Sequence, residues 1–334
     1  MTSFDALRAR AAVDGFSGVV RVDRAGDTVF EQAWGWADRR HRLANTTGTR
    51  FGIASGAKAF TALAVMSLVE DGTFTLDTTA RSVLGTDLPQ IADDVTIRHL
   101  LGHRSGIGDY LDEDSGHAIS DYVMSVPVHL LATPEDYLTV LDGFPAAFAA
   151  GERFAYNNGG FVVLALIAER GSGVGYHQLV QERVCDPAGL GDTAFLRSDA
   201  LSGDAALGYL ERDGLRTNVL HLPVRGVGDG GIYTTTADLR RFWTAMFDGR
   251  ILPAERVTEM IAEPSDAPEH GRRYGLGFWL HPTRHELLLE GYDAGVSFRS
   301  SHDPATKTTR TIISNTSEGA WDLVATLEKV LDTS

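Results

Sequence analysis

Apolar and polar residues alternate near both ends of the chain, and this alternation predicts β-strands there. Residues 16–23 and 28–36 carry β-branched and aromatic residues at alternating positions, with the turn-forming segment 24–27 between them. Such a pattern is typical of a β-hairpin. Four later segments with short links predict an antiparallel meander: residues 274–280, 286–290, 295–301 and 308–314.

The middle of the chain shows the 3.6-residue periodicity of helices. We expect helices over residues 3–13, 56–71, 96–103, 134–141, 161–170, 236–247 and 318–332. Because strands at both ends enclose helices, the pattern predicts an α+β fold with one antiparallel sheet built from both termini and flanked by helices. The predicted sheet domain comprises residues 1–72 and 226–334, and an inserted, mainly helical domain comprises residues 73–225.

Charge and composition narrow the choice of partners. The 334 residues carry a formal net charge of −15, which disfavours binding to nucleic acid or to an anionic membrane. The N-terminus has charges throughout and no apolar signal-peptide core, and no stretch approaches about 18 uninterrupted apolar residues. We therefore expect a cytoplasmic protein without a membrane span, provided that residue 1 is the natural start. The single cysteine, Cys185, excludes an internal disulfide.

Ser55 and Lys58 carry the strongest chemical signal. Ser55 begins an apolar, helix-periodic run, and Lys58, one of three lysines in the chain, follows three residues later. Residues i and i+3 share a helix face, so the ammonium group can reach the hydroxyl. A lysine partly withdrawn from water beside a serine can act as its base. The pattern indicates an acyl-transfer nucleophile, although taken alone it also fits an N-cap serine beside a solvated lysine.

A second candidate lies in the loop Tyr156-Asn157-Asn158, just before the apolar helix at 161–170. A tyrosine on such a loop can carry a proton, and an amide two residues later can orient a lysine or a substrate. Taken alone, the segment also fits a turn with a packed tyrosine. Three further tyrosines are candidates for the lining of a cleft near the serine: Tyr110, Tyr122 and Tyr137.

His99 and His103 stand four residues apart on a predicted helix, a spacing that metal sites also use. No Glu stands between them in the zinc-protease position, so a structural or site-flanking role is favoured over a metal-dependent hydrolase. Residues 226–231 fit the pattern Gly-x-Gly-x-x-Gly, but strand-like residues follow where a dinucleotide site needs a helix. We therefore expect no metal and no cofactor.

The fourth candidate segment, residues 290–298, reads as a tight entry into a strand. A small residue there, such as Gly295, lets a strand edge approach a substrate with a backbone N–H facing an oxyanion. In this order, the four segments resemble the penicillin-recognising serine hydrolases, which include class C β-lactamases, DD-peptidases, related carboxylesterases and D-amino-acid amidases. Further matches are residues 99–107, 230–238 and 274–278.

The resemblance covers most of the chain and implies a β-lactamase/transpeptidase-like fold. It also implies roles for individual residues. Ser55 would be acylated, Lys58 and Tyr156 would share the proton transfers, and Asn158 would be the orienting amide. The backbone N–H groups of Ser55 and Gly295 would bind the oxyanion.

The last motif departs from its relatives, which usually carry Lys-Thr-Gly or His-x-Gly. This chain has Tyr292-Asp293-Ala294 and is one residue shorter before Phe298. Losing the cation that helps to hold the carboxylate of a β-lactam or of a D-Ala terminus would weaken its binding by about 1–3 kcal/mol. Asp293 would instead favour a cationic group such as a free amine. The candidates for contacting or orienting the substrate are Asn158, Tyr292, Asp293, Gly295 and His103.

The sequence thus predicts a serine hydrolase that works through an acyl-enzyme. We expect an esterase, an amidase or a D-peptide hydrolase that acts on a small molecule or on a short peptide or ester. A β-lactamase or DD-carboxypeptidase is the alternative. An alternative of another class is a non-catalytic module that senses or holds its ligand as an acyl adduct. The oligomeric state stays open.

Overall fold

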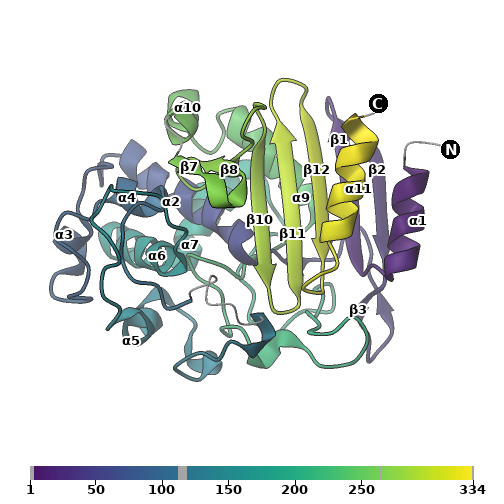
Figure 1. The fold of residues 1–334 in the computed structure, drawn as a ribbon, viewed down its shortest axis with the longest axis horizontal. Helices are drawn as coiled ribbons and strands as arrows, with labels where there is room; N and C mark the ends of the chain where they lie inside the picture. Colours follow the sequence, from purple (N-terminus) through teal and green to yellow (C-terminus); the bar gives the residue numbers. More distant parts are fainter. Residues whose placement is uncertain (1–3, 112–118, 263–264, 333–334) are drawn as a thin grey trace.

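The structure is a computed structural model, and it describes residues 4–111, 119–262 and 265–332. Its centre is an eight-stranded antiparallel sheet with the order β2-β1-β12-β11-β10-β9-β8-β7 (Figure 1). The strands of this sheet are β1 (Gly18–Arg24), β2 (Asp27–Trp34), β7 (Ser265–Ala267), β8 (Arg272–Tyr274), β9 (Trp279–Leu280), β10 (Leu287–Asp293), β11 (Val296–Asp303) and β12 (Thr308–Ser314). Two short pairs lie outside it: β3 (Trp36–Asp38) with β4 (Leu43–Ala44), and β5 (Phe51–Gly52) with β6 (Tyr233–Thr234).

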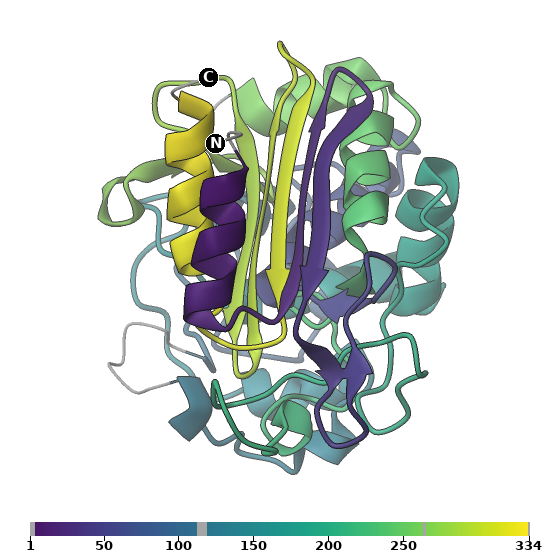
Figure 2. The ribbon, with the colours of Figure 1, turned by 90° about the vertical axis from the view of Figure 1, so that its right-hand side faces the viewer.

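The first and last strands of the chain pair with each other, from Gly18 opposite Ser314 to Arg24 opposite Thr308. This pairing confirms the prediction of one sheet built from both termini, and the α+β class is confirmed with it. Helices lie on both faces of the sheet (Figures 1 and 2). The division into two domains at residues 72 and 225 stays a prediction.

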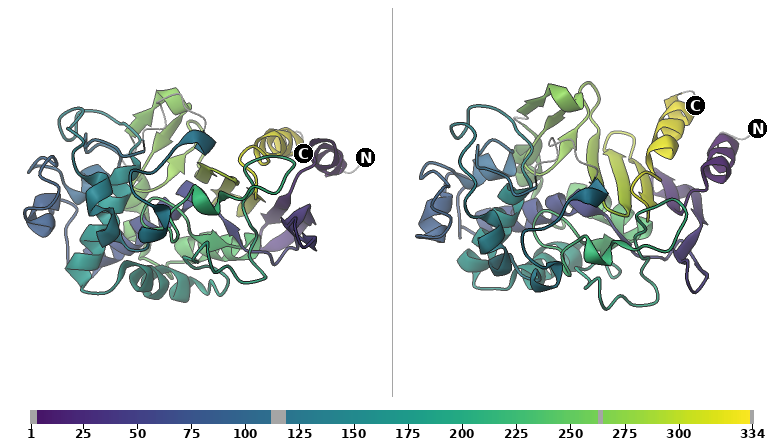
Figure 3. Two further views of the ribbon diagram at one scale, coloured as in Figure 1. Left: turned by 90° about the horizontal axis from the view of Figure 1, so that it is seen from below. Right: turned by 60° about the horizontal axis from the view of Figure 1, so that its bottom comes forward.

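The helices of the described ranges are α1 (Asp5–Asp14), α2 (Ala57–Glu70), α3 (Ala80–Leu84), α4 (Ile97–Leu101), α5 (Leu138–Leu141), α6 (Asn158–Ser172), α7 (Tyr176–Val180), α8 (Asp186–Ala188), α9 (Thr236–Phe247), α10 (Ala254–Ala262) and α11 (Trp321–Asp332). None of the helices in these parts of the chain is both long enough and apolar enough to cross a membrane. The helices α3 to α6 gather at one end of the molecule, and both termini lie at the other (Figure 3).

Two predicted elements have a different extent in the structure. The predicted helix at 96–103 ends at Leu101, and His103 has a φ of 52°, in the left-handed region that ends a helix. The predicted strand at 274–280 is two strands, because the chain turns where the Gly275 N–H donates to the Phe278 carbonyl at 2.9 Å. Gly277 allows this turn, since its φ is 92° and a Cβ there would lie 2.2 Å from the Ala62 Cβ.

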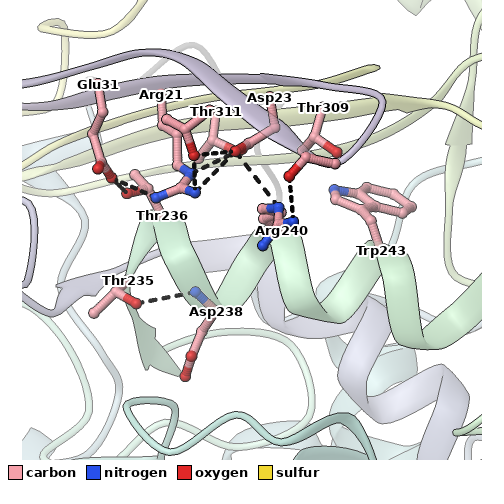
Figure 4. A network of polar contacts seen from close by, with 12 residues as sticks. Arg21, Asp23, Glu31, Thr235, Thr236, Asp238, Arg240, Trp243, Thr309 and Thr311 are labelled. Carbon is pink, nitrogen blue, oxygen red and sulfur yellow. Dashed lines mark hydrogen bonds and ion pairs between the residues drawn. The ribbon is translucent and has the colours of Figure 1, made fainter. Parts of the chain in front are cut away.

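The two faces of β1 carry different kinds of side chain, apolar on one face and charged on the other. Val20 and Val22 face α1 and α11, which pack side by side (Figure 2), and they join an apolar cluster there. Successive residues of a strand point to opposite faces, so Arg21 and Asp23 face α9 instead (Figure 4). The Arg21 guanidinium donates to the Asp23 carboxylate at 2.8 and 2.9 Å. This charged contact anchors α9, whose Arg240 Nε lies 3.6 Å from Asp23 Oδ1.

Two helices that are apolar all round, α2 and α6, form the centre of the other half. Every residue of α2 from Ala57 to Val69 is buried, and so is every residue of α6 from Asn158 to Ala168. A helix of this kind must be enclosed by other elements, and these two pack against each other. Their first turns therefore come together inside the molecule, and these turns carry the sequence-predicted site.

Candidate active site

Ser55 lies in a strained turn. It belongs to the 3₁₀ turn Ala54–Gly56 that leads into α2, and the φ of Ala54 is 45°, which is uncommon for a residue with a Cβ. The strand β10 runs close behind this turn, because a Cβ on Gly291 would lie 2.0 Å from the Ile53 carbonyl oxygen. The N–H groups at such a helix start have no acceptor within the helix, so the Ser55 N–H can serve an incoming oxygen.

Lys58 connects the serine to the two neighbouring segments. Its side chain is buried, with 2% exposed, and its Nζ donates to three oxygens. The acceptors are Ser55 Oγ at 2.9 Å, Asn158 Oδ1 at 2.7 Å and the Asp229 carbonyl at 2.8 Å. An ammonium has three N–H groups, so these bonds fix its orientation. A neutral amine held in the same position could take the serine proton.

The start of α6 holds Asn158 in place through a residue that the sequence analysis missed. The Asp109 carboxylate accepts the backbone N–H of Asn158 at 2.6 Å and that of Gly159 at 2.8 Å. A negative charge is favourable at a helix N-terminus. Burial nevertheless raises the pKa of Asp109 to about 6, against the effect of these two N–H donors. The carboxylate stands 49 positions before the amide it holds, so no local pattern could have revealed the contact.

Tyr156 lies beside the lysine, as predicted. The Lys58 Nζ is 4.9 Å from the centre of the Tyr156 ring. The ring is stacked on Trp279 of β9, with centres 5.8 Å apart and planes 10° apart. On another side it meets the His103 ring at 4.4 Å. Packing thus fixes the tyrosine next to the Ser55–Lys58 pair.

His103 packs against the segment that carries Tyr156 and Asn157. It is buried, and its Nδ1 accepts the Asn157 N–H at 3.1 Å, so the neutral ring carries its proton on Nε2. Burial lowers the pKa of His103 well below its ordinary value, and the charge of Lys58 lowers it further. His103 is not among the residues that line the cavity at Ser55. His103 contacts Tyr156 and Asn157, and its predicted role in orienting the substrate stays a prediction.

The other histidine of the predicted pair has a different partner. His99 Nδ1 accepts the Thr96 N–H at 3.3 Å, within a capping box at the start of α4. Over the described parts of the chain, no three His, Cys, Asp or Glu side chains are grouped so that they could hold a metal ion.

A cavity opens at Ser55 and is rich in tyrosine and poor in positive charge. The three tyrosines that the sequence singled out all line it, as do two carboxylates, Asp229 and Asp293. Among the described residues, no lysine and no arginine line it. The lining residues that matter here are Ser55, Tyr110, Tyr122, Tyr137, Asn158, Ser198, His221, Asp229, Tyr292 and Asp293.

Asp229 is the second residue that the sequence analysis missed, because nothing in the glycine-rich segment 226–231 distinguishes this carboxylate from a loop residue. The carboxylate is nearly buried, with 9% of the residue exposed, and Tyr110 donates its hydroxyl to it at 2.5 Å. Burial raises the pKa of Asp229, while the charge of Lys58 and the Tyr110 hydroxyl act in the opposite direction. The tyrosine precedes its partner by 119 positions.

The last motif lies at a tight hairpin. Asp293 pairs with Val296 across a two-residue turn, Ala294 and Gly295, and Gly295 has a φ of 70°. The Gly295 N–H donates to Ser317 Oγ at 2.8 Å, and the Ala294 N–H donates to Asp293 Oδ1 at 2.8 Å. Gly295 is also not among the cavity-lining residues. In this arrangement the Gly295 N–H does not face Ser55 as an oxyanion donor, because the shortened hairpin turns it toward Ser317.

Tyr292 stands at the rim of the cavity. Its side chain is 39% exposed, and its hydroxyl donates to Glu318 Oε1 at 2.8 Å. Tyr292 and Asp293 are thus brought to the cavity as predicted, whereas Gly295 is directed away from it.

Comparison with known proteins agrees with this architecture. The family model for beta-lactamase matches residues 5–333. The crystal structure of a penicillin binding protein from Bacillus halodurans has a TM-score of 0.90 and 35% sequence identity to this chain, with 97% of this chain and 99% of that chain covered. The chain belongs to the beta-lactamase family and is a serine hydrolase of that fold.

Two further relatives are named for other activities than penicillin binding. A D-aminopeptidase from Brucella anthropi is 30% identical over 277 residues, which are 80% of this chain and 50% of the relative. Esterase EstB from Burkholderia gladioli is 33% identical over 199 residues, which are 58% of this chain and 50% of the relative. The chain spans about half the length of both relatives.

Proposed function

We propose that this protein is an esterase or amidase that works through an acyl-enzyme on Ser55. The observation that carries the proposal is the 2.9 Å contact between the buried Lys58 Nζ and Ser55 Oγ. Ser55 Oγ attacks the substrate carbonyl while its proton passes to the neutral Lys58 amine. The Ser55 N–H donates to the oxyanion that forms. Lys58 and Tyr156 then carry the proton to the leaving group, which departs as an alcohol or amine.

Deacylation reverses these proton movements. A water molecule attacks the acyl carbon, its proton passes to the Lys58–Tyr156 pair, and Ser55 Oγ regains a proton as the carboxylic acid leaves. No metal or cofactor enters either half of the reaction.

The charge of the cavity supports esters and amides without a carboxylate near the scissile bond. Asp229 and Asp293 line it, and within the part of the chain that the structure describes no arginine or lysine of the lining could pair with a substrate anion. The likeness to a D-aminopeptidase and to an esterase supports the same choice and makes D-residue amides and esters the first substrates to test.

A second candidate function is that of a β-lactamase or DD-carboxypeptidase. The 35% identity to a penicillin binding protein over nearly the full length of both chains favours it. The acidic lining of the cavity weighs against it, because the carboxylate of a penicillin would meet the carboxylates of Asp229 and Asp293.

Intact-protein mass spectrometry separates these functions. Wild-type protein and Ser55→Ala would be incubated with a fluorophosphonate and, separately, with a penicillin. We expect one phosphonate adduct per chain on the wild type, none on Ser55→Ala, and no stable penicillin adduct or penicillin turnover. A rapid penicillin adduct that depends on Ser55 would favour the second candidate. In a third incubation, with a D-residue ester, an acyl adduct that never hydrolyses would indicate a binding or sensor module. A lack of any adduct in all three incubations would refute the acyl-enzyme.

A further inference from the structure

The cavity at Ser55 is lined by a carboxylate, Asp229, and by no lysine or arginine of the described ranges. Within the described residues Asp229 forms no ion pair, and its carboxylate receives the hydroxyl of Tyr110. Lys58 bonds the backbone carbonyl of Asp229 rather than its carboxylate. Burial raises the pKa of this carboxylate and outweighs the charge of Lys58 and two hydrogen bonds, from the Tyr110 hydroxyl and from the Asp229 backbone N–H, which favour the ionised form. A further cation in the cavity would offset this cost of burial.

A second carboxylate reaches the same cavity from another element. Asp293 ends β10, whereas Asp229 precedes β6, and both line the cavity together with Tyr137. Burial, followed by the charges of Asp229 and Asp293, raises the pKa of the Tyr137 hydroxyl, so one tyrosine lies within electrostatic reach of both carboxylates. The cavity also contains Ser198 Oγ, a buried atom without a hydrogen-bond partner in the described part of the chain.

Lys58 connects the backbone of Asp229 to the nucleophile, Ser55. A single Lys58 ammonium donates both to Ser55 Oγ at 2.9 Å and to the Asp229 carbonyl at 2.8 Å. Asp229 and Ser55 also line the same cavity, so a group held by the Asp229 carboxylate shares that cavity with a carbonyl carbon under attack by Ser55. An α-amino acyl group has this form, because one carbon separates its amine from its carbonyl.

We infer that Asp229, oriented by Tyr110, and Asp293 form an ammonium subsite that binds the primary amine of the substrate's acyl part. The inference rests on the proposed acyl-enzyme and names its substrate class, the esters and amides of α-amino acids with a free amine. The substrate ammonium supplies a positive charge next to the two carboxylates, and its three N–H groups can donate to carboxylate and hydroxyl oxygens. The aromatic rings of the lining add attraction for a cation.

Protection of Ser55 against a fluorophosphonate tests the subsite without a known substrate. Three ligands of one shape would be compared at pH 7: benzylamine as the cation, benzyl alcohol as the neutral ligand and benzoate as the anion. We expect half-protection by benzylamine at a concentration at least ten-fold below that of benzyl alcohol, with benzoate the weakest. Equal protection by all three, or best protection by benzoate, would overturn the subsite while leaving the acyl-enzyme intact. A chain that is not labelled at all would overturn both.

Variants test whether the preference for benzylamine depends on the Asp229 carboxylate. Asp229→Asn keeps the size of the side chain and removes its charge, and we expect it to reduce the preference for benzylamine over benzyl alcohol to within about three-fold. Asp93→Asn is the matched control, because the Asp93 side chain is 91% exposed and not part of the cavity lining; it should keep the full preference. An undiminished preference in Asp229→Asn would refute the role of this carboxylate. If Asp229→Asn does not fold, Asp293→Asn provides the same comparison.

Turnover gives a second readout. Glycine p-nitroanilide and p-nitroacetanilide differ by one amine and have no stereocentre. The ratio of their kcat/KM values should fall at least ten-fold from the wild type to Asp229→Asn and stay unchanged in Asp93→Asn. An equal ratio in all three proteins would contradict the amine-bearing substrate class.

Discussion

Lys58 and Asn158 join the first turns of two buried helices, because the lysine Nζ donates to the asparagine Oδ1 at 2.7 Å across 100 positions of sequence. The same Nζ also donates a hydrogen bond to Ser55 Oγ. The relative position of α2 and α6 therefore decides where the proposed base stands, and residues that set this position control the reaction without touching the substrate.

Asn158→Ala removes one of the three acceptors of Lys58. We expect kcat/KM to fall about ten- to hundred-fold and the free energy of unfolding to fall by about 1–3 kcal/mol, the cost of a buried donor left unsatisfied. Steady-state kinetics and urea denaturation measure the two effects. Asn315→Ala is the control, since its buried amide donates to the carbonyls of Trp36 and Leu207 instead. It should lose stability but keep turnover, and unchanged turnover in Asn158→Ala would contradict the role of the amide.

Asp109 predicts an acidic limb in the pH profile. Ionised Asp109 accepts both N–H groups at the start of α6, whereas the protonated form is a weaker acceptor, and its pKa is raised to about 6. We expect kcat/KM to rise as the pH rises through about 6. In Asp109→Asn this limb should be lost, together with part of the maximal rate. A limb that persists unchanged in the variant would assign the titration to another group.

The same carboxylate makes an opposite contribution to stability. Its pKa rises on folding from 3.8 to about 6. Between these values the folded chain keeps a proton that the unfolded chain has lost, so the contribution of Asp109 to stability falls as the pH rises through this window. The full loss is about 3 kcal/mol. Urea denaturation at pH 4 and pH 7 should therefore show a smaller loss for Asp109→Asn than for the wild type.

Tyr156→Phe keeps the ring packing and removes only the hydroxyl. The ring contacts with Trp279 and His103 do not involve the oxygen, so we expect the fold and KM to be retained. If the hydroxyl carries protons, kcat should fall about 10²- to 10⁴-fold. Single-turnover kinetics would show whether acylation or deacylation slows. A kcat within two-fold of wild type would remove Tyr156 from the reaction.

We expect His103 to stabilise the fold through its Nδ1, which accepts the Asn157 N–H. His103→Leu leaves the Asn157 N–H without an acceptor and should destabilise the fold by about 1–3 kcal/mol. His103→Gln provides a carbonyl oxygen and should recover part of this loss. Because the pKa of His103 is lowered in the folded chain, its contribution to stability is present above the ordinary histidine pKa and is lost as the pH falls. Thermal unfolding of both variants between pH 5 and 8 checks this.

Gly291→Ala tests the support behind the nucleophile. The added Cβ would lie 2.0 Å from the Ile53 carbonyl oxygen, so the turn that carries Ser55 must move. We expect fluorophosphonate labelling of Ser55 to slow at least ten-fold. Gly203→Ala meets no atom within 4 Å and should label at the wild-type rate. Equal labelling rates would show that the turn tolerates the shift.

The sequence predicted the parts of the site that depend on local spacing. Ser55 and Lys58 lie three positions apart at one helix start, so a motif sufficed to find them, and Tyr156 and Asn158 share one loop. Asp109 and Asp229 act on partners 49 and 119 positions away, which no local pattern contains. The direction of the Gly295 N–H depends on the length of the hairpin between β10 and β11. Because a change of one residue in a hairpin reverses the side to which each following group points, the motif alone does not predict this direction.

The pairing of β1 with β12 has a consequence for synthesis on the ribosome. The helices around Lys58 and Asn158 leave the exit tunnel long before residues 308–314, which supply the neighbour of the first strand. The turn that holds Ser55 also lacks the support of β10 until residues 287–293 have emerged. We therefore expect a nascent chain to gain the proposed activity only after β10 and β12 have been translated, so products of interrupted translation would carry Ser55 without a supported turn.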